Sequence, residues 1–180
     1  MRTAYIALGA NLASWAGSPE ATLSAAVSRL AALGRITKQS SLYSTEPVGF
    51  ADQPRFVNAV VAFETELGPR NLLNALLAIE REFGRDRSAG FPNGPRTLDL
   101  DILLLDDLEI HEPDLDLPHP RLAERFFVLV PLNEIAPHLK IVGQKQTVAE
   151  LAQNLRSSRK GDSDAVVPME SDRWRAAANG

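Results

Sequence analysis

Apolar and polar positions change their spacing several times along the first 105 residues, and each spacing predicts an element. Four runs that alternate or are rich in β-branched residues predict strands at residues 3–8, 35–44, 56–67 and 98–105. Apolar residues recur at helical spacing over residues 19–33 and 69–83. Ser18 is a typical helix cap before the first of these runs, and Gly34 and Gly84 end the two helices. The order βαββαβ predicts an α+β protein with a ferredoxin-like core, an antiparallel sheet with both helices on one face.

The chain beyond residue 105 predicts C-terminal helical additions to this core. An acidic loop at 106–120 precedes helical segments at 121–135 and 147–155. Residues 157–180 are polar and without periodicity, which is typical of disorder. Since no internal repeat or linker divides the chain, we expect one domain over residues 1–156 and a disordered tail over residues 157–180.

Composition narrows the classes of partner and compartment. Hydrophobic residues make up 44% and charged residues 23% of the 180 residues, and the net charge is -4. This balance gives no support for nucleic acid or a membrane surface as a partner. The chain has no cysteine, which excludes disulfides and thiolate metal sites. No apolar stretch has the length of a signal peptide or membrane span, so we expect a cytoplasmic protein, and we expect it to be a monomer.

The segment RTLDLDILLLDD, residues 96–107, places two like charges on one face of a strand. Aspartate is a poor strand former, and side chains two residues apart point the same way, with Cα atoms about 6.5 to 7 Å apart. Mg²⁺ prefers oxygen ligands and usually shares its shell with substrate phosphates. The pattern predicts that Asp99 and Asp101 bind magnesium. The alternative is an amphipathic strand whose acids face water.

A loop with glycine and proline before this strand carries Arg85, Arg87 and Arg96. Arginine binds phosphate oxygens through a planar fork of donors. The chain contains neither of the two common glycine-rich phosphate motifs, so metal and arginine are the groups expected to meet phosphate charge. Asn58 lies in mid-strand, where asparagine is unfavourable and needs hydrogen-bond partners if it is buried.

Several blocks of the sequence resemble the hydroxymethyl-dihydropterin pyrophosphokinase family of the folate pathway. The blocks, in chain order, are AYIALGANLAS, STEPVGFADQPRFVNAVV, IEREFGRDR, GPRTLDLDILL and LPHPRLAERFFVLVPLNEIAP. The resemblance continues to about residue 155. It implies transfer of the pyrophosphoryl group of ATP, the co-substrate, to the hydroxymethyl oxygen of 6-hydroxymethyl-7,8-dihydropterin, with release of AMP.

The resemblance also implies roles for individual residues. Asp99 and Asp101 match the ligands of two Mg²⁺ ions, and Arg85 and Arg96 match phosphate-binding arginines. The positions that match the pterin site are Thr45, the backbone of Val48, Phe56, Asn58 and Phe127, with the two aromatic rings on either side of the pterin. The positions that match the ATP site are Glu80, Arg87, Ile102, His119 and Arg125.

Three positions depart from the pattern of the family. Many members have a basic residue and a tryptophan where this chain has Pro92 and Asn93, and some have a glutamine in place of Leu77. Pro92 and Asn93 bear on how the loop before the aspartate strand closes over the ligands, and Leu77 bears on the affinity for ATP. The aspartates and arginines of the expected chemical centre are unchanged.

Two other functions fit parts of the pattern. A magnesium-dependent nucleotidyltransferase with another acceptor would use the same metal and nucleotide residues, but Phe56, Asn58 and Phe127 favour a flat heterocycle as acceptor. RNA-recognition domains share the βαββαβ order and display aromatic residues on their inner strands. Here the last core strand shows aspartates instead, which repel a phosphate backbone.

Overall fold

The computed structural model describes residues 1–88, 92–158 and 166–177. Within these residues a six-stranded antiparallel sheet has the order β5-β1-β4-β3-β8, and β2 also pairs with β4. Its strands are β1 (Arg2–Ala10), β2 (Arg35–Gln39), β3 (Leu42–Thr45), β4 (Phe56–Thr65), β5 (Asp99–Leu105) and β8 (Val166–Met169). The order of β5, β1, β4 and β3 is that of a ferredoxin-like sheet, which confirms the predicted fold class.

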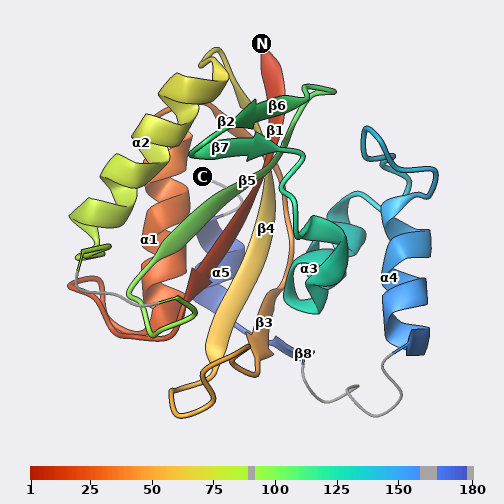
Figure 1. Cartoon of the computed structure of the whole chain (residues 1–180). Coiled ribbons are helices and arrows are strands. Elements are labelled where there is room, and N and C mark those ends of the chain that lie inside the picture. The colour runs from red at the N-terminus through yellow and green to blue at the C-terminus, as the bar shows by residue number, and fades with distance from the viewer. Residues whose placement is uncertain (89–91, 159–165, 178–180) are drawn as a thin grey trace.

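Helices α1 (Pro19–Ala31) and α2 (Pro69–Glu82) cover one face of the sheet, as predicted (Figure 1). Ser18 caps α1, and its hydroxyl accepts from the backbone N–H of Ala21. Gly84 follows α2 with φ +81°, a conformation that favours glycine and ends the helix. The even-numbered side chains of β1, from Ala4 to Ala10, pack with both helices in the main core.

The opposite face carries α3 (Phe126–Ile135) and α4 (Val148–Ser158), which form a second core with β4 and β5. The single helix predicted over residues 121–135 is wrong at its start, because a 3-10 turn (Leu122–Glu124) comes first and Arg125 is extended. Since α3 begins only at Phe126, the end of the sheet beside it stays open on this face. No helix in the described part of the chain is long and apolar enough to cross a membrane.

Two segments have more structure than their sequence pattern predicts. The strand predicted over residues 35–44 is two strands, with a break at Ser40 where Val60 N–H donates to the serine hydroxyl. The predicted acidic loop contains a hairpin of β6 (Ile110–Glu112) and β7 (Leu115–Leu117). Leu115 and Leu117 are buried, so the short Leu-Asp-Leu alternation there is a real strand signal.

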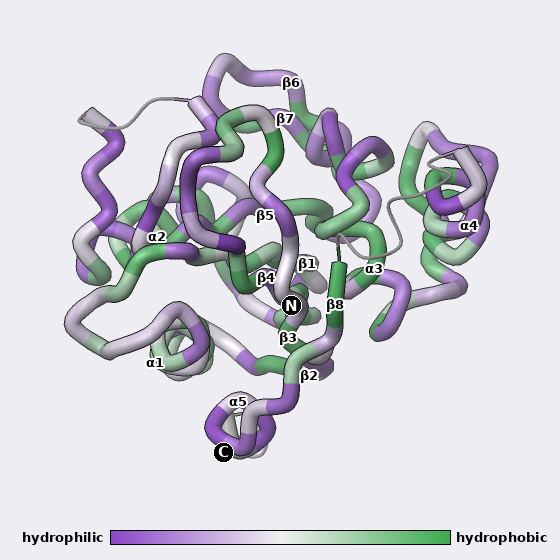
Figure 2. Tube along the Cα trace, turned by 90° about the horizontal axis from the view of Figure 1, so that it is seen from below, coloured by the Kyte–Doolittle hydropathy of each residue, from purple (hydrophilic) through white to green (hydrophobic). Residues whose placement is uncertain are grey.

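The prediction of a disordered tail over residues 157–180 is wrong for residues 157–158, which end α4, and for residues 166–177. β8 pairs with β3, and α5 (Asp172–Ala177) lies against α1 (Figure 2). Trp174 is only 3% exposed; its ring N–H donates to Ser40 O at 2.7 Å, and its own carbonyl accepts from Gln39. Trp174 packs this segment against the core. One buried residue in a polar sequence produces no helical or strand periodicity, so the pattern did not predict the contact. Residues 159–165 and 178–180 of the predicted tail lie outside the described residues.

Replacing Trp174 by alanine should lower the free energy of unfolding by about 3 to 5 kcal/mol, because the ring fills part of the main core. In a protein of this size the melting temperature should fall by roughly 6 to 20 °C. Thermal unfolding followed by circular dichroism measures the change. Trp15, which is 63% exposed, is the matched control, and Trp15→Ala should cost less. Equal melting temperatures for Trp174→Ala and the unmodified chain would mean that α5 does not dock.

Candidate active site

An open cavity of about 260 Å³ lies at the end of the sheet that α3 leaves uncovered. Its floor comes from β1, β4 and β5, and its rim from the loop after β3, the loop after α2 and the start of α3. In Figure 1 the loop residues 11–17, 46–55, 85–88 and 92–97 all lie toward the lower end of the sheet. The cavity therefore gathers residues that are far apart in the sequence.

Strand register places the polar residues of the floor in one row. Gly9 pairs with Asn58 on one side and with Asp99 on the other, and Ala7 pairs with Asp101. Directly paired residues point to the same face of a sheet, so the amide and both carboxylates face the cavity. A Cβ on Gly9 would lie 2.8 Å from Asn58 Oδ1, so only glycine leaves room for this amide.

Four arginines surround the two aspartates without tight pairing. The closest approach to Asp99 is 3.5 Å from Arg96 Nε, followed by 3.7 Å from Arg85 and 3.9 Å from Arg87. Arg125 lies 3.9 Å from Asp101. These distances exceed those of hydrogen bonds, so the charges compensate one another only in part.

The donor set fits a hard divalent cation. Burial, and then the neighbouring Asp99 charge, raise the pKa of Asp101 from 3.8 to about 6. A cation between the two carboxylates would remove this repulsion. Among the described residues no group of three or more metal-ligating side chains occurs. Such a set suits Mg²⁺, which keeps waters and takes further oxygens from substrate phosphates.

Two arginine donors in the cavity have no acceptor within the described residues. The Nε–H groups of Arg85 and Arg96 are buried there without a hydrogen bond. A buried donor without a partner is costly, and an anionic oxygen relieves that cost. Both guanidinium groups lie beside Asp99, Arg85 through a terminal nitrogen at 3.7 Å and Arg96 through Nε at 3.5 Å.

His119 is held as a neutral ring. Burial, and then the charge of Arg125, lower its pKa from 6.5 to about 4. The backbone N–H of Arg121 donates to His119 Nδ1 at 3.1 Å, which leaves the proton of the neutral ring on Nε2. Near pH 7 the side chain can donate one hydrogen bond from Nε2 and carries no charge.

The other end of the cavity combines aromatic rings with an amide. The guanidinium group of Arg96 lies 4.9 Å from the centre of the Phe56 ring, and that of Arg125 lies 5.6 Å from Phe127. Asn58 is 7% exposed, and its Nδ2 donates to Thr45 Oγ1 at 2.7 Å. Asn58 Oδ1 can then accept from a ligand, and the rings offer flat faces to a heterocycle.

Most of the residues predicted from the sequence line this cavity. They are Thr45, Val48, Phe56, Asn58, Arg85, Arg87, Arg96, Asp99, Asp101, His119, Arg125 and Phe127. Glu80 and Ile102, predicted for the ATP site, do not line it. Glu80 is 1% exposed; it accepts from Leu100 N–H at 2.8 Å and binds Arg87, so it holds β5 and this arginine in place. Ile102 packs in the main core on the opposite face.

Eight residues that line the cavity are absent from the predicted site, and three of them have polar side chains: Glu46, Asn93 and Arg121. Asn93 has φ 60°, the left-handed conformation that asparagine adopts most easily after glycine. The Asn-Gly pair at 93–94 is a turn signal that could have drawn attention to it. Arg121, two residues after His119, has no such signal.

Comparison with known proteins gives consistent matches. The model of the family described as 7,8-dihydro-6-hydroxymethylpterin-pyrophosphokinase (HPPK) matches residues 5–137. A Pseudomonas aeruginosa protein named 2-amino-4-hydroxy-6-hydroxymethyldihydropteridine pyrophosphokinase is 47% identical over 139 residues, 76% of this chain and 82% of that protein. An Arabidopsis thaliana protein named Folate synthesis bifunctional protein, mitochondrial, is 50% identical over 100 residues, 56% of this chain and 18% of that protein.

Solved structures show the same fold. A Plasmodium falciparum HPPK-DHPS triple mutant has a TM-score of 0.71 at 16% sequence identity, and the match covers 94% of this chain and 47% of that one. This chain thus spans about half the length of that protein. At this level of identity the likeness concerns the fold alone.

Proposed function

The chain belongs to the 7,8-dihydro-6-hydroxymethylpterin-pyrophosphokinase family, and on this premise we propose that it transfers the pyrophosphoryl group of ATP to the hydroxymethyl oxygen of 6-hydroxymethyl-7,8-dihydropterin. The products are AMP and the pterin diphosphate, and the reaction is a step of folate biosynthesis. The observation that carries the proposal is one cavity that brings aspartates and arginines together with two aromatic rings and an amide.

The acidic half suits the phosphates of ATP. Asp99 and Asp101 would hold Mg²⁺, which when bound neutralises phosphate charge and lowers the pKa of the acceptor hydroxyl. The guanidinium groups of Arg85 and Arg96, which line the cavity, would donate hydrogen bonds to phosphate oxygens. His119 would add a hydrogen bond from a neutral Nε2–H, which does not depend on pH near 7.

The aromatic half suits the pterin. Phe56 and Phe127 would contact the two faces of the ring, while Asn58 Oδ1 accepts from its N–H edge. The hydrogen bond that Asn58 Nδ2 donates to Thr45 Oγ1 orients that amide before the ligand arrives. This placement brings the hydroxymethyl group toward the aspartates, since Asn58 and Asp99 both pair with Gly9.

Transfer of this kind needs positioning and charge neutralisation more than acid-base chemistry. The acceptor oxygen forms a bond to the β-phosphorus, and the bond from that phosphorus to the α–β bridging oxygen breaks. The bridging oxygen leaves as part of AMP, and the proton of the hydroxymethyl group is released to water. Arg87, held by Glu80, and Arg125, beside Asp101, add positive charge around the reacting phosphates.

The products distinguish this reaction from its alternatives. The protein is incubated with Mg²⁺, ATP and 6-hydroxymethyl-7,8-dihydropterin, and the nucleotides are separated by chromatography. The proposal expects AMP in equal amount with pterin diphosphate. ADP would indicate transfer of a single phosphoryl group, and pyrophosphate would indicate a nucleotidyltransferase.

Three expectations from the sequence stay predictions: two Mg²⁺ ions, a monomeric chain and a cytoplasmic location. The number of ions follows from titration calorimetry of Mg²⁺ in the presence of a nonhydrolysable ATP analogue. Sedimentation velocity measures the mass in solution.

A further inference from the structure

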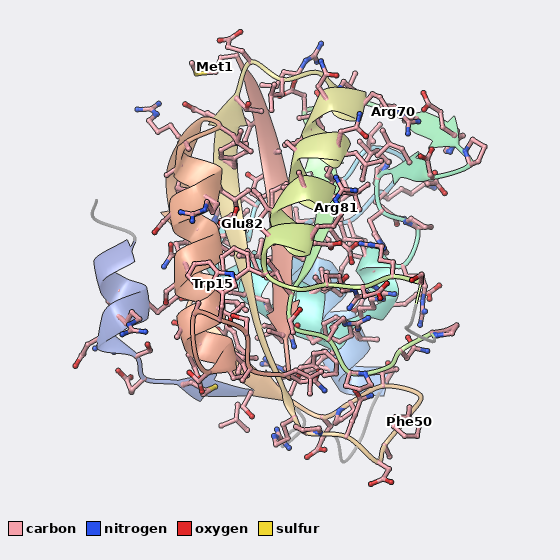
Figure 3. All side chains as sticks on the ribbon, turned by 90° about the vertical axis from the view of Figure 1, so that its left-hand side faces the viewer. Met1, Trp15, Phe50, Arg70, Arg81 and Glu82 are labelled. Carbon is pink, nitrogen blue, oxygen red and sulfur yellow. The ribbon has the colours of Figure 1, made fainter. Side chains whose placement is uncertain are left out.

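A segment beyond the part of the chain that the family model matches lies beside the candidate active site. Residues 166–177 form β8 and α5, whereas the match ends at residue 137. Val166 of β8 pairs with Thr45, the last residue of β3, and Thr45 lines the cavity. Figure 3 shows α5, in blue, beside α1, and both β8 and the loop with Phe50 toward the lower end of the sheet. The C-terminal segment is thus the direct neighbour of a residue of the proposed pterin site.

The two ends of this segment are held in different ways. Trp174 is 3% exposed, and its ring N–H donates to the carbonyl of Ser40, just before β3. Met169 packs against the main core. Val166 is only partly buried and Val167 is 44% exposed, so pairing with β3 is what holds the beginning of β8. The segment is therefore anchored in the core away from the cavity and attached beside the cavity through strand pairing.

β8 supports a strand that is short and ends at the cavity. β3 has four residues, and the loop at residues 46–55 begins directly after Thr45. The end of a strand opens most easily, and it opens more easily still when only one of its sides is paired. Thr45 pairs with Phe56 of β4 on one side and with Val166 of β8 on the other, and it is 2% exposed. Pairing on both sides holds the end of β3 in place.

Thr45 in turn orients the side chain that faces the pterin. Its Oγ1 accepts from Asn58 Nδ2 at 2.7 Å, and both residues are buried. If the end of β3 moved away, this buried donor would lose its acceptor, and the amide would turn toward another partner. Asn58 Oδ1 would then no longer be directed at the N–H edge of a ligand. Asp99 and Asp101 lie on β5, at the opposite edge of the sheet from β8, so the expected metal site is far from such a change.

We propose that β8, anchored by Trp174, is a positioning strand for the acceptor, which holds Thr45 and through it Asn58 in the arrangement that binds the pterin. None of residues 166–177 lines the cavity, so the effect passes through β3. The C-terminal segment thereby strengthens the binding of the acceptor and leaves the binding of the nucleotide unchanged. The proposal rests on the proposed function for the identity of the acceptor, and on strand pairing and one hydrogen bond for the link.

Nuclear magnetic resonance of the ligand-free protein tests the link without any substrate. Val167→Pro removes the backbone N–H next to Pro168, which has none, and so weakens the pairing of β8 with β3. The side-chain amide proton that Asn58 donates to Thr45 should then exchange with water roughly three- to tenfold faster. Val167→Thr, the conservative variant, keeps the N–H and the β-branched shape at this exposed position and should exchange like the unmodified chain.

A milder variant and the opposite result complete this experiment. Val167→Gly keeps the N–H but weakens the strand through backbone entropy, so it should speed the same exchange by a smaller factor, and it decides the question if Val167→Pro fails to fold. Exchange of the Asn58 amide proton at the rate of the unmodified chain in the folded variants would overturn the link.

Calorimetry tests what the strand does for binding. 6-Hydroxymethyl-7,8-dihydropterin is titrated into protein saturated with Mg²⁺ and a nonhydrolysable ATP analogue, and the analogue is titrated by itself, well below the melting temperature. Val167→Pro should weaken pterin binding at least about fivefold and leave nucleotide binding within about twofold. Unchanged pterin affinity with a lower melting temperature, or equal losses for both ligands, would contradict the proposal. If the unmodified chain bound neither ligand, the proposed function would fail, and the exchange of the Asn58 amide would still decide the link.

Discussion

Replacing Asp101 by asparagine should lower the rate of pyrophosphoryl transfer at least about 10²-fold and leave the fold intact. The substitution removes one of two carboxylates expected to hold Mg²⁺, while the side chain keeps its size. Asp99→Asn should have an effect of the same order. Single-turnover formation of AMP measures the rate, and Asp107→Asn, which changes an exposed acid on the hairpin side, is the matched control. Turnover like that of the unmodified chain in both variants would rule out the metal assignment.

The same substitution should stabilise the metal-free protein, with a definite dependence on pH. Folding raises the pKa of Asp101 from 3.8 to about 6, so the folded protein binds this proton more tightly than the unfolded chain does. The contribution of Asp101 to the free energy of unfolding is fully present below about pH 4, where the carboxyl is protonated in both states. It is lost as the pH rises through about 6. Asp101→Asn should therefore gain about 1 to 2 kcal/mol at pH 7.5, allowing for screening by water, and nothing at pH 4. Melting curves in EDTA and in Mg²⁺ check this, since Mg²⁺ should stabilise the unmodified chain more than the variant.

Arg96→Ala should lower kcat/KM about 10²- to 10³-fold, and Arg85→Ala should have a similar effect. Both guanidinium groups lie against Asp99, and both have a buried Nε–H without an acceptor among the described residues. Since both are in place before ATP binds, both substitutions should weaken the binding of ATP as well as slow its reaction. Steady-state rates and titration of a fluorescent ATP analogue separate the two effects.

A lysine substitution and a surface control test whether the planar guanidinium group itself is needed. Arg96→Lys keeps the charge but loses the planar fork, so it should recover only part of the lost activity. Arg81→Ala, at an exposed position in the last turn of α2, should leave both measurements unchanged. If Arg96→Ala and Arg85→Ala bind and react like the unmodified chain, the arginines act only on the charge balance of the empty cavity.

Local pattern was sufficient for both helices of the core, for three of its strands and for which residues of these elements share a face. Alternation in residues 98–105 indicated that Asp99 and Asp101 point together, because the period of a strand is fixed by its backbone. Ser18 and Gly84 marked helix ends through capping and through a left-handed φ. The resemblance to the family then brought in His119 and Phe127, whose own surroundings in the sequence carry no chemical signal.

Contacts between distant segments were decided only by the tertiary structure. A strand pattern tells which side chains share a face but not which residue of a neighbouring strand lies opposite, so the row of Asn58, Gly9 and Asp99 needed the register. Ile102 lies on the core face of the same strand as the aspartates, away from the cavity. Trp174 forms hydrogen bonds with Ser40 and Gln39, which lie more than 130 positions earlier in the chain. Such bonds depend on how the packed elements meet, and therefore the spacing of apolar residues in the sequence does not predict them.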